Sequence, residues 1–131
     1  MAAMPRRLLW LPLGLAAAVL LAGCGGGKKY SLEKTRACLA KQHGLIVLKS
    51  TDFVASTALG GALTAKFPHN QVTISFGLDS DEAERLATAY RRFRGRNIGI
   101  EDILRPDHNA VLLWQAHPSS DDESTIHGCL K

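Results

Sequence analysis

The stretch that decides the fold is residues 62–76, ALTAKFPHNQVTISF. Apolar residues occupy alternate positions on both sides of its middle: Leu63, Ala65 and Phe67, then Val72, Ile74 and Phe76. Such alternation is typical of a strand that buries one face. The residues between the two halves, Pro68, His69 and Asn70, are common in turns. The stretch therefore predicts a β-hairpin with one apolar face.

A helix is expected directly after the hairpin. Asp79 can cap its beginning, and Glu82 stands three residues later, as in a capping box. Apolar residues then recur at intervals of three and four: Ala83, Leu86, Ala87, Tyr90 and Phe93. This spacing places them on one side of a helix. Gly95 ends the pattern, so we expect a helix over residues 80–94.

The chain ahead of the hairpin predicts a helix and a strand. Ser31 is a good N-cap and Gly44 a good C-terminal stop, which favours a helix over residues 32–43. Residues 45–48, Leu-Ile-Val-Leu, are apolar at both alternating sets of positions, so we expect a strand in the middle of the sheet, covered on both faces. Residues 51–61 fit either a short helix capped by Asp52 or a loop.

The last third of the chain predicts a strand and a closing helix. Residues 97–105 fit a short strand, a helical turn or the two in succession, and residues 106–109 fit a loop. The apolar run at 110–115 predicts a strand. Ser120 and Glu123 have capping-box spacing, and Gly128 is a suitable end for the helix that follows.

This order of elements predicts the fold class. Helix, strand, hairpin, helix, strand and helix favour an α+β fold, a two-layer sandwich with helices packed on one face of a mainly antiparallel sheet. A ferredoxin-like arrangement is the topology we expect. In it the first and last helices are neighbours.

The N-terminal segment resembles a known export signal. Arg6 and Arg7 precede an apolar stretch over residues 8–22, which falls short of the roughly 20 residues that span a membrane. Leu21-Ala22-Gly23-Cys24 then resembles the lipobox of bacterial lipoproteins. The resemblance implies that residues 1–23 are a signal peptide and that Cys24 is lipidated, with palmitate among the expected acyl groups. An ordinary secretory signal and an uncleaved anchor are the alternatives.

The rest of the chain is then one tether and one domain. Residues 24–29 hold the lipidated cysteine and a glycine- and lysine-rich tether, and residues 30–131 form a single small α+β domain. Assigning Cys24 to lipid leaves Cys38 and Cys129, an even pair in an exported chain, so we predict a disulfide rather than two buried free thiols. Two of the net +4 charges belong to the signal, so the charge does not argue for nucleic acid.

Two groups of polar residues are candidate sites. Four arginines at the end of the long helix can bind a polyanion such as phospholipid headgroups or a cell-wall polymer, although cations there also stabilise the helix itself. They are Arg91, Arg92, Arg94 and Arg96. Five histidines lack the spacing of a metal site, yet the fold can gather His108 and His117 with Asp107 at one edge. The alternative is that these are ordinary surface histidines.

No catalytic motif is present in the sequence. There is no phosphate-binding loop and no Gly-x-Ser-x-Gly nucleophile elbow. We therefore expect a membrane-anchored lipoprotein on the extracytoplasmic face, a binding or interaction module of the cell envelope without cofactor or metal. Its expected partners are the membrane and an envelope protein or polymer. The alternatives are an envelope enzyme or metal-dependent protein with a site assembled from distant residues, and a carrier with a pocket between sheet and helices.

Overall fold

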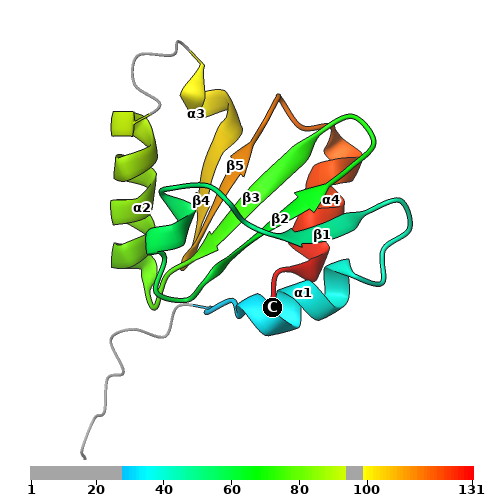
Figure 1. The fold of residues 1–131 in the computed structure, drawn as a ribbon, viewed down its shortest axis with the longest axis horizontal. Coiled ribbons are helices and arrows are strands. Elements are labelled where there is room, and N and C mark those ends of the chain that lie inside the picture. The colour runs from blue at the N-terminus through cyan, green and yellow to red at the C-terminus, as the bar shows by residue number, and fades with distance from the viewer. Residues whose placement is uncertain (1–27, 94–98) are drawn as a thin grey trace, which may run out of the picture.

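The protein folds around one five-stranded antiparallel sheet. The computed structural model describes residues 28–93 and 99–131 (Figure 1). In spatial order the strands are β1 (Ile46–Lys49), β2 (Ala62–Lys66), β3 (Gln71–Phe76), β5 (Ala110–Trp114) and β4 (Leu104–Asp107). Every neighbouring pair is antiparallel.

The predicted hairpin is confirmed as β2 and β3. Leu63 lies opposite Ile74 and Ala65 opposite Val72, so the alternating apolar residues share one face, as the pattern requires. Asn70 fixes the turn, because its side-chain oxygen accepts a hydrogen bond from the backbone N–H of Ala116 at 3.1 Å. The hairpin is thereby tied to the end of β5.

Two helices cover the apolar face of the hairpin. They are α1 (Leu32–Leu39) and α4 (Ser120–Cys129). Leu39 and Ile126 of these helices are fully buried against the side chains of Leu63, Ile74 and Trp114. The sheet with α1 and α4 forms the expected two-layer α+β sandwich, and the first and last helices are neighbours, as predicted.

The long helix α2 (Ser80–Phe93) packs on the other face of the sheet. Its predicted inward stripe is confirmed as far as Tyr90: Leu86 and Tyr90 are buried in one cluster with Val111 and Leu113 of β5. Phe93, predicted to belong to the same stripe, is instead 65% exposed at the end of the helix. Helices therefore lie on both faces around β4 and β5, a difference from the expected one-sided packing. The alternation in β5 explains it, because both sets of its side chains are apolar.

The ferredoxin-like topology is not the one observed. That topology consists of two split β-α-β units, whereas here β1, β2 and β3 form a meander and only β3, α2 and β4 form such a unit, with β5 paired between its two strands. The chain moves to the far side of β3 only once, through α2, the short helix α3 (Ile100–Ile103) and β4. Residues 97–105 thus supply a helical turn and a strand in succession, one of the alternatives expected, with 97 and 98 outside the described residues.

The prediction for residues 45–48 is wrong in its position. The strand β1 lies at the edge of the sheet, and three of its four residues are exposed. The reason is that β2 pairs with β3 on its other side, so β1 has a neighbour on one side only. Between β1 and β2 the chain forms the 3₁₀ turn η1 (Ala55–Thr57), where Asp52 accepts a hydrogen bond from the Ala55 N–H at 2.9 Å.

Some helix ends also differ from their predictions. The first helix ends at Leu39 rather than at residue 43, and α2 is described to Phe93. In the closing helix the N-cap is Ser119, whose hydroxyl accepts from the Asp122 N–H at 3.1 Å, and Gly128 lies inside the helix. None of the helices in residues 28–93 and 99–131 is long and apolar enough to cross a membrane.

Candidate functional site

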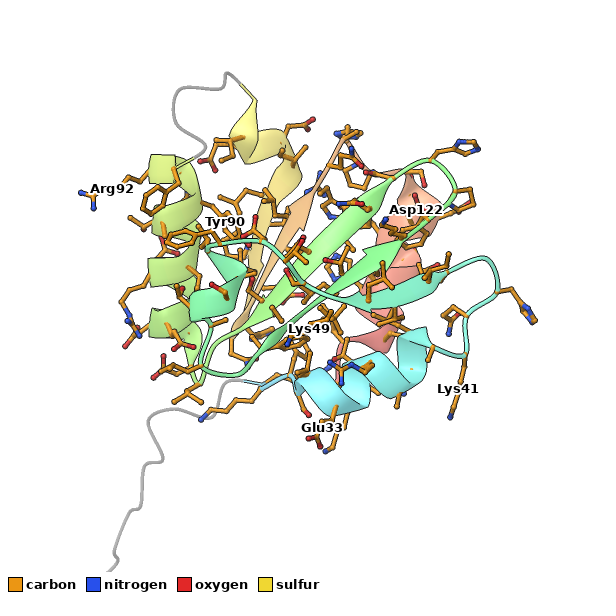
Figure 2. The ribbon with its side chains drawn as sticks, in the orientation of Figure 1. Glu33, Lys41, Lys49, Tyr90, Arg92 and Asp122 are labelled. Carbon is orange, nitrogen blue, oxygen red and sulfur yellow. A yellow bond between two sulfur atoms is a disulfide. The ribbon has the colours of Figure 1, made fainter. Side chains whose placement is uncertain are left out.

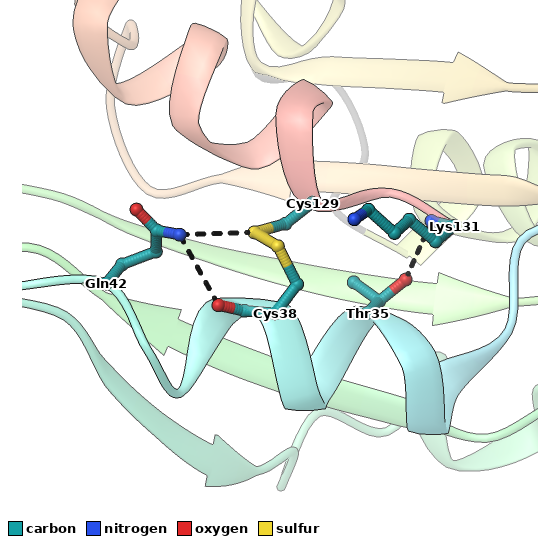
Figure 3. The surroundings of a disulfide bond; sticks show 5 residues. All are labelled: Thr35, Cys38, Gln42, Cys129 and Lys131. Atoms are coloured by element: carbon teal, nitrogen blue, oxygen red, sulfur yellow. Dashed lines mark hydrogen bonds between the residues drawn. A yellow bond between two sulfur atoms is a disulfide. The ribbon is translucent and has the colours of Figure 1, made fainter.

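The predicted disulfide is confirmed and joins α1 to α4 (Figure 3). The Cys38 and Cys129 sulfur atoms are 2.02 Å apart, and the two Cα atoms 5.3 Å. Gln42 lies beside the bond and donates from Nε2 to the Cys38 carbonyl oxygen at 3.4 Å. Lys131 donates its backbone N–H to the Thr35 hydroxyl at 3.3 Å. The chain end and the first helix are therefore held together at one corner of the domain.

The arginine group is divided in the structure. Arg91 donates from Nε to Glu101 at 2.7 Å and lies 3.4 Å from Glu84, and the hydrogen bond to Glu101 is the main cause of its raised pKa. Arg92 is exposed on α2 (Figure 2). Arg94 and Arg96 lie outside the described residues. Arg91 is therefore paired with carboxylates of the protein itself. Anion binding by the four arginines stays a prediction.

The histidines do not gather as the sequence suggested. His117 lies by Asp102, with its Nδ1 2.7 Å from Oδ1, and not by Asp107. The physical reason is the strand pairing: β4 and β5 run antiparallel with Leu104 opposite Leu113, so His117 follows the end of β5 far from Asp107. Within residues 28–93 and 99–131, no group of three or more His, Cys, Asp or Glu side chains can hold a metal ion.

Asp107 has other neighbours instead. His127 Nδ1 is 3.3 Å and His108 Nε2 3.7 Å from its carboxylate, and the Tyr30 hydroxyl donates to it at 3.3 Å. Burial, and then Asp107, raise the pKa of Tyr30. Asn109 holds the Tyr30 backbone by accepting from its N–H at 2.6 Å. These contacts attach the beginning of the domain to β4 and α4.

The feature that the sequence did not predict is an exposed apolar edge. Ile46 is 60% and Leu48 43% exposed, although both are large apolar residues in a strand. Leu48 lies opposite Thr64 and Ile46 opposite Lys66, so both point to the face on which α2 packs. The segment after β1 crosses in front of the sheet toward α2 (Figure 1), where Asp52 accepts from the Tyr90 hydroxyl at 2.9 Å.

We call this surface the open edge and define it as β1 together with Lys66. Residues 40–49 and 62–66, which form β1, its lead-in and β2, contain no carboxylate. They contain Lys41, His43, Lys49 and Lys66, all exposed. Figure 2 shows Lys41 projecting into solvent beside the turn that leads to β1. The open edge is thus both apolar and basic.

The described pockets are small and peripheral. One of about 340 Å³ lies between the hairpin turn and the beginning of α4, lined by Phe67, His69 and Asp122 among others. Another of about 320 Å³ lies beside the beginning of α1, lined by Tyr30, Phe76 and Leu78 among others. Neither is an apolar cavity between the sheet and a helix, which a carrier requires.

Comparisons with protein-family models, with curated proteins and with solved structures found no match to this chain. Its function is therefore argued from the chemistry of its own surface. At the open edge two large apolar side chains are exposed on an edge strand, and one side of that strand has no neighbouring strand to pair with its backbone groups.

Proposed function

We propose that this protein is a lipoprotein of the cell envelope, anchored on the extracytoplasmic face through Cys24, and that its domain is an interaction module. The observation that carries the interaction role is the open edge, where Ile46 and Leu48 are 60% and 43% exposed on an edge strand. The proposal of a lipid anchor rests on the resemblance of residues 21–24 to a lipobox.

The two edges of the sheet are treated differently. In β4, the other edge strand, Pro106 lacks an N–H and cannot pair with a further strand, which is a common protection of edges. Arg105 and Asp107 of the same strand are engaged by Glu123 and His127 of α4. In β1 only Lys49 is a protective residue type, and no proline is present. The contrast supports β1 as the edge kept free for a partner.

Burial of the open edge by a partner would contribute favourably to the free energy of binding. Full burial of a leucine or isoleucine side chain contributes roughly 1.5–3 kcal/mol. Ile46 and Leu48 are each about half exposed, so about half of this free energy remains to be gained at each residue when a partner binds. Two residues then offer about 2 kcal/mol before any backbone hydrogen bond forms. A small edge of this kind suits a moderate and reversible interaction.

The tether limits where partners are found. Six residues, 24–29, reach at most about 20 Å when fully extended. A domain on such a tether stays within one domain diameter of the membrane surface. Partners are therefore expected among membrane-associated or membrane-proximal proteins of the envelope.

Site-specific photo-crosslinking in cells tests the proposed surface. A photoreactive residue at position 48 should crosslink to a discrete partner of the full-length protein. The matched control is position 78, because Leu78 is a leucine of comparable exposure, 57%, that lies just before α2. Equal crosslinking from both positions, or none from position 48, would contradict the proposed surface.

The anchor is tested separately. Labelled palmitate should be incorporated into the wild-type chain and not into Cys24→Ser. Incorporation into the variant would refute lipidation at this residue while leaving the interaction surface untouched.

A second candidate function is an envelope enzyme, and the observation that favours it is the Asp107 cluster. Its carboxylate is approached by two imidazoles and a phenol from distant parts of the chain, His127, His108 and Tyr30. A panel of hydrolase substrates on the purified protein tests it, with His127→Ala as the control. A blank result would remove this candidate.

A further inference from the structure

We infer that the partner of the open edge is an extended, acidic polypeptide segment that pairs with β1 as a sixth strand of the sheet. This inference rests on the proposed function, since it names the chemistry that the same surface recognises. It follows from the backbone of β1, from the side chains beside it and from the distribution of charge.

The backbone of β1 can pair with a further strand. Only β2 pairs with it, so alternate residues of Ile46–Lys49 direct their N–H and C=O groups away from the sheet. Within the part of the chain that the structure describes, no hydrogen bond from outside the sheet reaches these groups. An extended chain satisfies such a row of donors and acceptors residue by residue, which is the basis of recognition by strand addition.

The side chains set a pattern on the incoming strand. Ile46 and Leu48 point to the α2 face, whereas Val47, opposite Ala65, points to the face of α1 and is half-buried. Residues directly opposite one another in a sheet share a face and are in contact. Apolar side chains at alternate positions of the partner would therefore cover Ile46 and Leu48.

The charge of the open edge selects acidic residues. Lys66 lies directly opposite Ile46, Lys49 ends the strand and Lys41 precedes it. Among the described residues none of these three lysines takes part in an ion pair.

Three of the four described arginines of α2 and β4 differ in this respect, the exposed Arg92 being the exception. Arg85, Arg91 and Arg105 each lie within ion-pair distance of a glutamate. Lys41, Lys49 and Lys66 are thus available for carboxylates of a partner that lies along this edge.

Two other occupants fit less well. A second copy pairing through its own β1 would bring the same lysines together, and like charges that face each other across a strand pair are unfavourable. An anionic lipid surface would attract the lysines, but hydrocarbon cannot satisfy the free N–H and C=O groups of a strand edge. An acidic peptide strand satisfies both the charges and the backbone.

The test uses the full lipidated protein in nanodiscs of zwitterionic lipid and three short synthetic peptides. The first alternates valine and glutamate, the second alternates valine and lysine, and the third is the valine–glutamate peptide with its central amide nitrogens methylated. Binding is followed by fluorescence anisotropy, and hydrogen exchange of the backbone amides of Ile46–Lys49 reports where the peptide lies. The first peptide should bind saturably and slow exchange in β1.

Matched variants identify the groups involved. Lys49→Glu combined with Lys66→Glu should weaken binding of the valine–glutamate peptide at least fivefold. Lys34→Glu, which makes the same kind of charge change on the exposed side of α1, should leave it within twofold. Leu48→Thr should weaken binding severalfold, whereas Leu78→Thr should not.

Each contrary outcome overturns the inference. Equal binding of the valine–lysine peptide or of the methylated peptide, unchanged exchange in β1, or no saturable binding would do so. Protection of β1 by phosphatidylglycerol vesicles alone, or by self-association of the protein, would assign the edge to lipid or to a second copy. If position 48 still crosslinks to a protein in cells while the acidic peptide fails, the surface stands and only the partner chemistry is wrong.

Discussion

Removal of the Cys38–Cys129 disulfide should strongly destabilise the domain. The bond joins residues that are 91 positions apart, so it encloses nearly all of the folded chain. The perturbation is the double variant Cys38→Ala/Cys129→Ala in residues 25–131, the expected mature chain without its lipidated cysteine.

The magnitude follows from the loop that the bond closes. In the chain-entropy account, a crosslink across 91 residues removes about 4.6 kcal/mol of conformational freedom from the unfolded chain at 25 °C. The Cys129 side chain is 2% exposed, so its truncation adds a smaller packing loss. Small domains are stable by about 5–15 kcal/mol, so the variant should keep between almost none and two thirds of its stability.

Urea denaturation measures this difference. The oxidised wild type and the double variant are compared by tryptophan fluorescence, which reports on the buried Trp114. The wild type in reductant is the control, because it should approach the variant, and reductant should leave the variant unchanged. A loss below about 1.5 kcal/mol would refute the reasoning, since it would mean that the unfolded chain gains little freedom when the bond is absent.

Three further predictions concern single residues. Cys24→Ser should abolish incorporation of labelled palmitate, as stated above. Asn109→Ala should lower the free energy of unfolding by about 2–3 kcal/mol in urea titrations, because it leaves the Tyr30 N–H and the Gly77 carbonyl without a partner. Because burial and Asp107 raise the pKa of Tyr30, the folded state retains a proton that the unfolded state loses, so stability should fall as pH rises above about 10. Tyr30→Phe should remove this part of the alkaline decrease in urea titrations across that pH range.

The sequence was most informative where local rules act alone. The hairpin at residues 62–76 could be predicted because alternation and turn residues agree within one short stretch, and its register followed. The helix after it could be predicted because two acidic side chains satisfy backbone N–H groups at its beginning: Asp79 accepts from the Glu82 N–H at 2.8 Å, and Glu82 accepts from the Leu78 N–H at 2.9 Å. The disulfide could be predicted from the count of cysteines in a chain expected to be exported.

Predictions that depend on the pairing of distant elements were less successful. His117 was expected near Asp107, but these residues lie at opposite ends of the β4–β5 pair. His127 reaches Asp107 instead because α4 docks on the apolar face of the sheet, where Asp107 also points. No local pattern states which end of a strand a later helix will reach, so this cluster could not be found from spacing.

The wrong prediction for residues 45–48 is the most informative of all. Their apolar residues at both alternating positions indicated cover on both faces, and the structure supplies it for Val47 but leaves Ile46 and Leu48 exposed. A single exposed leucine requires no explanation, since much of any protein surface is apolar. Two at alternate positions of an edge strand, beside the exposed Lys49 and Lys66, are the basis of the proposed interaction surface. The residues therefore carry the pattern of a central strand, and the proposed sixth strand beside β1 would place β1 inside the sheet.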